Sequence, residues 1–293
     1  MTWGTTGLTS KVLNRLSAVD AVSVGALRLL VAFPALLLLA QTLAPGTLRL
    51  LLKREWRAVL LMGLSMAAYN GCFFAALART SVTAGTLLAI CSAPLFVAIL
   101  ARLFLDEPLT RPILLALATG LIGTALLVGG QGGRDPPIWG AGSGLALLRL
   151  DYALGNLLAL GAGLSYAVYA LVGRATQVGG GTAPASLAAL SFTTAAILLT
   201  PLALANGLRL PANFPAWGAV LYLGLVPTAL AYALYLRGLK TVPATVASIG
   251  TLVEPLTASL LAALFLGERL TPGSFAGAGL MLSSLAILSL RKT

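Results

Sequence analysis

The sequence contains no histidine, and it is poor in charged side chains of either sign. Only 9% of its 293 residues are charged, and 8 of these are acidic, whereas soluble domains carry roughly 25% charged residues. Without histidine, the chain has no His metal ligands, no Ser/His dyad and no HExxH zinc motif. It also has no P-loop GxxxxGK[ST], so the sequence gives no sign that ATP hydrolysis directly powers its activity. We therefore expect no enzyme activity, no catalytic residue, no cofactor and no metal site.

Disulfides and nucleic-acid binding are equally unsupported by the sequence. The two cysteines, Cys72 and Cys91, both lie inside apolar runs, which argues against a disulfide framework. The net charge is +11, but the 19 Lys and Arg residues stand singly at the ends of apolar runs. Because they form no basic tail or stripe, they indicate loop charges that set membrane orientation, with no nucleic-acid partner.

Long apolar runs are what the chain does contain. Hydrophobic residues make up 58% of it, and the mean hydropathy is +0.96. About 20 apolar residues are needed for each helical crossing of a bilayer, and only helices or closed barrels satisfy their backbone groups there. The runs lack the alternation of a barrel strand. The sequence thus predicts an all-α polytopic membrane protein in contact with membrane lipid.

Gly, Pro and charged residues divide the runs into ten predicted spans. The first is short for a crossing and begins with TWGTTGLTSKVLNRL. The predicted spans cover 1 to 16, 21 to 43, 56 to 78, 82 to 105, 111 to 130, 153 to 173, 185 to 206, 216 to 238, 243 to 266 and 272 to 290.

Two halves of the chain resemble each other. The Gly- and Pro-rich stretch at 129 to 151 cannot continue a helix and is predicted to be a linker. When the first half is shifted by 161 positions onto the second, a tryptophan, a glycine, a proline and an LFLxExLT pattern of one half align with those of the other. The aligned pairs include Trp56 with Trp217, Gly63 with Gly224, Thr80 with Thr241, Pro94 with Pro255 and Glu107 with Glu268. We therefore predict a five-helix repeat at 1–130, a linker at 131–152 and a second repeat at 153–293.

Five spans per half is an odd number, so the second copy must enter the membrane from the opposite side. This predicts an inverted 5+5 repeat with a solute site at the interface of the repeats near mid-depth. With a cytoplasmic N-terminus, eleven Lys and Arg residues fall on the cytoplasmic side and seven on the other, with Arg28 inside a span. The positive-inside rule then favours both termini in the cytoplasm.

Several segments resemble the drug/metabolite transporter superfamily, in particular its ten-span EamA-type members. They are LFLDEPLT, EPLTASLLAALFLGERLT, the TWGT start and ALRLLVAF, and the resemblance covers essentially the whole chain. The resemblance implies an inverted five-plus-five bundle that exports amino acids or other small metabolites. It also implies that the protein lies in the inner membrane of a bacterium. The first span of the family is longer than the one found here.

Glu254 is the most conspicuous candidate for a functional residue. It is twelfth of the 24 residues predicted for its span, so it lies near the bilayer centre. A charge there costs at least about 2.5 kcal/mol, so the side chain faces protein or a water-filled cavity. It is either a proton-linked switch or substrate anchor, or a structural group at the turn loosened by Pro255. The equivalent of this pair in the first half is Ala93-Pro94, which has no carboxylate.

Three other charged residues have simpler interpretations. Arg28 could approach Glu254 or a substrate carboxylate, but we favour a side chain that extends to the membrane interface. Glu107 and Glu268 stand at span ends. We favour a structural role for both, either pairing with Arg or capping a helix start.

Aromatic and polar residues recur on single helical faces of the predicted spans. A buried Tyr or Asn in lipid needs a partner, which favours an inward orientation over an interfacial belt. Ser and Thr more often bond their own helix carbonyls. With Glu254, the candidate substrate-binding residues are Asn70, Phe74, Tyr166, Tyr169, Thr228, Tyr232, Tyr235 and Ser248. The resemblance adds Trp3, which would face the same cavity in the arrangement of the family.

The leading functional hypothesis is a secondary transporter that exports a small-molecule solute by alternating access. A cavity lined by aromatic and hydroxyl groups with one carboxylate suits an amino acid. The alternative is an efflux transporter for drugs or lipophilic cations, with Glu254 as the counter-charge. Gly273 and Gly277 form a GxxxG, which we interpret as packing within one chain rather than as a dimer interface. We therefore expect a monomer.

Overall fold

The computed structural model describes residues 2–17, 19–80, 82–129, 150–180, 182–266 and 271–290. All regular secondary structure in these ranges is helical. Nine helical segments there are long and apolar enough to cross a membrane. Most of the predicted linker, like Glu268, lies outside the described residues.

The helices follow the predicted spans closely. The first half contains η1 (Thr2–Gly4), α1 (Thr5–Ser17), α2 (Ala21–Leu43), α3 (Thr47–Arg54), α4 (Trp56–Leu77), α5 (Val82–Phe104) and α6 (Arg111–Gly129). The second half contains α8 (Leu150–Val178), α9 (Pro184–Ala205), α10 (Phe214–Gly224), η2 (Leu225–Leu230), α11 (Ala231–Gly238), α12 (Ala244–Thr251), α13 (Val253–Leu266) and α14 (Pro272–Ser289). Together, η1 and α1 are shorter than a full crossing, so the first predicted span is not among the nine.

Two differences from the predicted boundaries have local causes. Helix α3 was not predicted, because its eight residues are too few for a span. It begins after Gly46, whose φ of 81° allows the chain to turn there. Helix α8 extends to Val178, beyond the predicted end at 173, since no Gly or Pro stands between Arg174 and Gly179 to stop it.

The two aligned prolines affect their helices differently. Pro94 lies inside α5, which runs through it as one helix. Pro255 is the third residue of α13, and the helix of this span is interrupted at Leu252, between α12 and α13. A proline in a first turn costs no hydrogen bond because the N–H groups there have no helical partner. Of the two aligned prolines, only the one in the second half therefore coincides with a helix break.

The contacts between helices define two compact units, and each unit draws helices from both halves of the sequence. Unit 1 comprises residues 71–167 and 244–293, and unit 2 comprises residues 2–70 and 168–243. Neither half of the sequence therefore forms a compact unit by itself.

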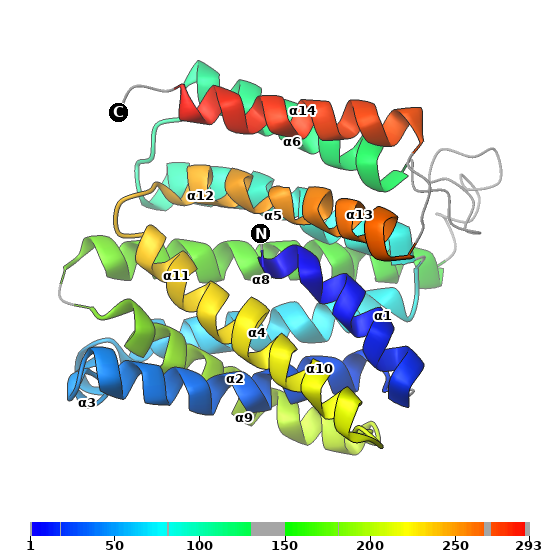
Figure 1. Cartoon of the computed structure of the whole chain (residues 1–293). Helices are drawn as coiled ribbons and strands as arrows, with labels where there is room; N and C mark the ends of the chain where they lie inside the picture. Colours follow the sequence, from blue (N-terminus) through cyan, green and yellow to red (C-terminus); the bar gives the residue numbers. More distant parts are fainter. Residues whose placement is uncertain are drawn as a thin grey trace. The chain divides into compact units, whose positions relative to one another are not determined.

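Unit 1 contains the antiparallel pair of α6 and α14, which lie side by side in Figure 1. The Ser284 hydroxyl donates to the Ala116 carbonyl at 2.6 Å. Near the other end of the pair, the backbones of Gly123 and Gly277 touch. The apolar core beside this pair contains Ala98, Ile113, Ala116, Leu117, Leu127, Ile249, Leu252 and Met281.

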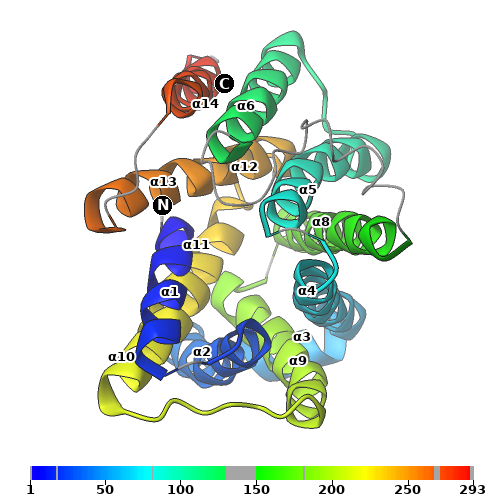
Figure 2. The ribbon, with the colours of Figure 1, turned by 90° about the vertical axis from the view of Figure 1, so that its right-hand side faces the viewer.

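Unit 2 contains a second antiparallel pair, α2 and α9. Thr47, just after α2, shares a 2.6 Å hydrogen bond with Ser186, near the start of α9. Helix α1 runs alongside α10 (Figure 2). The apolar cluster between α1, α2 and α10 contains Leu13, Val19, Val24, Leu27, Ala216, Val220 and Leu223.

One close contact occurs twice in unit 2, once for each half of the sequence. A Cβ on Gly224 of α10 would stand 2.5 Å from the Val31 Cβ and 3.1 Å from the Arg28 carbonyl oxygen of α2. A Cβ on Gly63 of α4 would meet the Thr194 side chain and stand 3.0 Å from the Ser191 carbonyl oxygen of α9. The sequence shift of 161 aligns Gly63 with Gly224 but Arg28 with Ala189. By the contact itself, Ser191 occupies the place of Arg28 in the second half.

Candidate functional site

An aromatic cluster in unit 2 gathers four of the ten predicted site residues. Trp3 of η1 stacks against Tyr232 and Tyr235 of α11, with ring centroids 5.0 and 5.6 Å apart. The Tyr232 ring also lies 5.7 Å from Tyr169 of α8 and 4.8 Å from Phe192 of α9. The interplanar angles lie between 54° and 90°, in the tilted and edge-to-face range that aromatic pairs prefer. Four helical elements therefore meet at Tyr232.

Phe192 belongs to this cluster, but the sequence did not indicate it. It is fully buried, and its ring lies edge-on to Tyr169 with a centroid distance of 6.4 Å. Helix α9 is apolar around most of its circumference. No periodic pattern therefore distinguished Phe192 from its apolar neighbours.

The π-helix η2 directly precedes α11, the helix that carries Tyr232 and Tyr235. Pro227 has no N–H to donate to the Leu223 carbonyl. The Thr228 hydroxyl instead donates to that carbonyl at 2.7 Å, and the helix widens by one residue per turn at this point. The hydroxyl of Thr228 is thus used by its own helix, and the side chain is fully buried.

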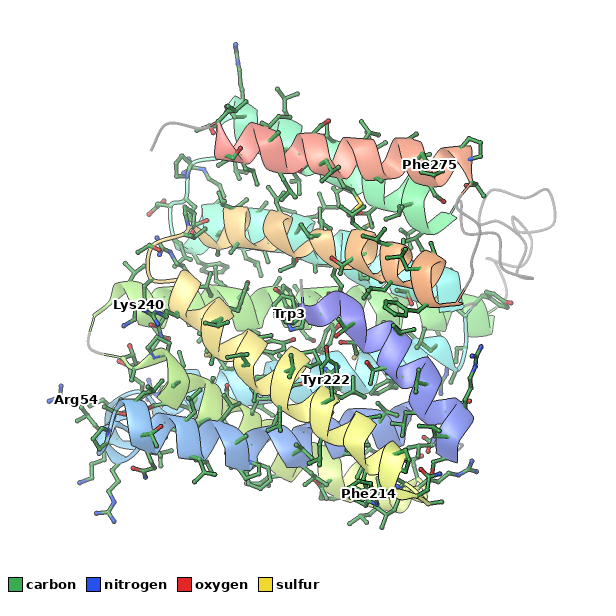
Figure 3. The ribbon with its side chains drawn as sticks, viewed as in Figure 1. Trp3, Arg54, Phe214, Tyr222, Lys240 and Phe275 are labelled. Atoms are coloured by element: carbon green, nitrogen blue, oxygen red, sulfur yellow. The ribbon has the colours of Figure 1, made fainter. Side chains whose placement is uncertain are left out.

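Two buried polar groups of the cluster have no hydrogen-bond partner among the described residues. They are the indole Nε1 of Trp3 and the hydroxyl of Tyr169, which faces Ser191 without reaching hydrogen-bond geometry. Trp3 is labelled in Figure 3, as is Tyr222, whose hydroxyl donates to the Thr5 hydroxyl at 3.0 Å. A buried donor without an acceptor is costly, so the packing of the cluster leaves these two polar groups unsatisfied.

The remaining predicted site residues are not part of the ring cluster. Asn70, in unit 2, donates to the Met66 carbonyl at 2.8 Å and is 2% exposed. In unit 1, Ser248 is fully buried and donates to the Thr245 carbonyl at 2.8 Å. Both therefore bond their own helices, the commoner behaviour of such side chains in membranes.

Phe74, Tyr166 and Glu254 also belong to unit 1. Phe74 is half-buried and packs edge-on against Phe73, whereas Tyr166 is 8% exposed. Glu254 is half-buried and lies in the first turn of α13, next to the break at Leu252. A carboxylate is favoured there because the start of a helix carries a partial positive charge.

Glu107 caps a helix start, which is one of the two structural roles predicted from the sequence. Its carboxylate accepts hydrogen bonds from the backbone N–H groups of Ala244 (2.7 Å) and Thr245 (3.1 Å). It also accepts one from the Thr245 hydroxyl at 2.9 Å. These bonds join the loop after α5 to the first turn of α12, and the side chain is 8% exposed.

Arg28 is only half-buried, but its guanidinium Nε is buried and has no partner among the described residues. Its backbone packs on Gly224, the eleventh of the 25 residues in the span Phe214–Gly238. The Arg28 backbone therefore contacts its neighbour near mid-span, and the extension of its side chain to the membrane interface stays a prediction.

Comparison with known proteins extends this description. The EamA-like transporter family matches the chain over residues 1–129 and 153–290. The uncharacterized transporter YwfM of Bacillus subtilis is 37% identical over 98% of this chain and 90% of its own length. The uncharacterized inner membrane transporter YicL of Salmonella typhimurium is 30% identical over 62% of this chain and 56% of its own length. A solved crystal structure shares the fold, with a TM-score of 0.80 and 20% identity over 99% of this chain and 93% of that one.

Proposed function

This chain belongs to the EamA-like transporter family and is an integral membrane transporter, not an enzyme, and we propose that it exports small metabolites, amino acids foremost, by alternating access. The proposed architecture is an inverted repeat of five and five spans, with both termini in the cytoplasm. Movement of the two repeats against each other would then expose the solute site to one side of the membrane at a time.

The observation that carries this proposal is the antiparallel packing of equivalent helices. Helices α6 and α14 are the last spans of the two repeats, and their contacts pair Ala116 with Ser284 and Gly123 with Gly277. Adding the repeat shift of 161 to Ala116 gives Gly277, and adding it to Gly123 gives Ser284. The two contacts thus exchange under the repeat, as a two-fold axis in the membrane plane requires. The α2 and α9 pair agrees with this arrangement.

The aromatic cluster supports an amino acid as the solute. Trp3 and Tyr235 are half-buried, so their rings keep partly open apolar faces beside polar groups, which suits a zwitterion with an apolar side chain. Lipophilic cations are the second candidate, because Tyr and Trp ring faces also attract cations and Glu254 supplies a counter-charge.

Flux measurements test the proposal. The purified protein is reconstituted in vesicles, and counterflow of radiolabelled amino acids and of tetraphenylphosphonium is compared with that of empty vesicles. Amino acid counterflow is the expected result. Uptake of the cation alone would favour the second candidate, and no protein-dependent flux of either class would contradict both.

Topology labelling tests the inverted repeat separately. Single cysteines replace Trp56 and Trp217, in a background without Cys72 and Cys91, and are labelled from outside whole cells. The two positions are equivalent in the repeat, so we expect them on opposite sides of the membrane. Labelling of both from the same side would rule out the inversion and, with it, this form of alternating access.

A further inference from the structure

Arg28 carries a charge that no described residue compensates through an ion pair. Unit 2 contains two acidic residues, Asp20 and Glu55. Asp20 accepts hydrogen bonds from Ser23 and lies eight residues before Arg28, about 12 Å along α2. Glu55 is exposed just before α4. Among the described residues Arg28 makes no ion pair, and its buried Nε has no acceptor.

Packing does not explain why this position is an arginine. The same contact between a glycine and a carbonyl occurs in the second half of the sequence, where Ser191 replaces Arg28 and Gly63 replaces Gly224. Ser191 is fully buried and donates to the Ala188 carbonyl at 3.0 Å. The fold therefore accommodates a small hydroxyl at this place. Because a charge inside the membrane is costly and usually functional, the guanidinium requires another explanation.

The surroundings of Arg28 suggest what it binds. Helix α2 packs against η2, and η2 leads directly into α11, which carries Tyr232 and Tyr235. The element η1, which carries Trp3, packs against η2 as well. Two buried N–H groups without acceptors, Arg28 Nε and Trp3 Nε1, thus belong to elements that contact the same π-helix. Within unit 2, the side chains that could compensate the charge are Asp20 and Glu55, and neither pairs with Arg28.

We propose that Arg28 binds the carboxylate of the transported solute. A guanidinium holds a carboxylate through two parallel N–H···O bonds, which a single amine or hydroxyl cannot match. The bound carboxylate neutralises the intramembrane charge, and the aromatic cluster contacts the rest of the solute. This inference rests on the proposed function and narrows it, because it selects carboxylate-bearing solutes over lipophilic cations.

The test compares each acid with its amide. Vesicles containing the full chain exchange radiolabelled L-leucine or L-phenylalanine against the unlabelled acid or against leucinamide or phenylalaninamide, which lack the carboxylate. The variants are Arg28→Ser, which copies the equivalent position of the second half, and Arg28→Lys, which keeps the charge. The matched control is Arg57→Ser, since Arg57 is an exposed arginine of the same unit that lies over the Trp56 ring. Size-exclusion profiles and thermal unfolding in detergent check that each variant folds.

For wild type and Arg57→Ser we expect the acid to compete about tenfold to a hundredfold better than the amide. This ratio corresponds to the binding free energy that a charge-assisted hydrogen bond contributes. In Arg28→Ser this preference should vanish, and in Arg28→Lys part of it should remain. A preference that survives in folded Arg28→Ser overturns the assignment, and so does a wild type that treats acid and amide alike while still moving the amino acid. If Arg28→Ser does not fold, the wild-type comparison and Arg28→Lys decide. A wild type that moves no amino acid at all contradicts the proposed function itself.

Discussion

Gly123 of α6 and Gly277 of α14 approach each other through their backbones. A Cβ on Gly277 would stand 2.6 Å from the Gly123 carbonyl oxygen, and a Cβ on Gly123 would stand 2.7 Å from the Gly277 carbonyl oxygen. Neither neighbour is a flexible side-chain end that could move aside. The GxxxG formed by Gly273 and Gly277 therefore uses its second glycine to pack two helices of the same chain.

We expect Gly277→Ala to destabilise the protein by about 1–3 kcal/mol, because the added methyl forces α6 and α14 apart. The matched control is Gly279→Ala in the same helix, where a Cβ would meet nothing within 4 Å. Thermal unfolding in detergent measures both variants. Equal behaviour of the two would mean that the α6 and α14 contact is looser than described.

Gly63→Ala and Gly224→Ala should lower stability by similar amounts, about 1–3 kcal/mol each. Both would place a Cβ against the side chain of a β-branched residue, Thr194 or Val31, and against a carbonyl of α9 or α2. Gly218→Ala in α10 is the control, because nothing lies within 4 Å of its Cβ position. A loss at only one of the two sites would show that the repeated contact is not energetically equivalent.

Replacing Glu107 by Ala should destabilise the protein by about 1–3 kcal/mol, since two N–H groups and a hydroxyl at the start of α12 lose their acceptor. Glu107→Gln should cost less, because its amide oxygen still accepts. The exposed Glu55→Ala serves as the control and should be nearly neutral. Denaturation in detergent followed by circular dichroism separates the three.

Glu254→Gln should remove the pH dependence of transport while the protein still folds. The carboxylate is the acidic side chain in the first turn of α13, and the amide has the same shape but does not titrate. Counterflow measured across a pH series compares the variant with wild type. An unchanged rate with an unchanged pH profile would assign Glu254 a structural role.

Asp20 provides a pH-dependent contribution outside the spans. Burial acts to raise the pKa of its carboxyl, but hydrogen bonds from the side chain and backbone of Ser23 outweigh it and hold the pKa below 3.8. Because the folded-state pKa is depressed, the stabilisation is present above the unfolded-state pKa and is lost as pH falls through the lowered value. Asp20→Ala should cost about 1 kcal/mol at neutral pH, and the difference in melting temperature from wild type should shrink in acid. A constant difference at every pH would contradict this account.

Features that depend on local composition could be predicted from the sequence. Apolar runs bounded by Gly, Pro and charge located the spans, and the alignment of Gly63 with Gly224 identified two residues that make the same contact. The capping interpretation of Glu107 is also confirmed. A short stretch of chain carried the information on the spans, whereas the partner of Glu107, the start of α12, could not be identified from it.

Features that depend on tertiary neighbours could not be predicted. Nothing in the apolar run of α9 distinguished Phe192, because its importance comes from the rings of Tyr169 and Tyr232 on other helices. The contact between Arg28 and Gly224 could not be predicted either, because position along a helix does not reveal what packs against it. The prolines show the same limit, since Pro94 and Pro255 align but only one stands at a helix break.

The distribution of both halves over both units has a consequence for how the protein is made. Helix α6 leaves the ribosome long before α14, the helix against which its Gly123 face packs. Likewise, α2 is synthesised well ahead of its neighbour α9. The early spans are therefore synthesised before the helices that cover their packing faces. Neither compact unit is complete until translation reaches the second half.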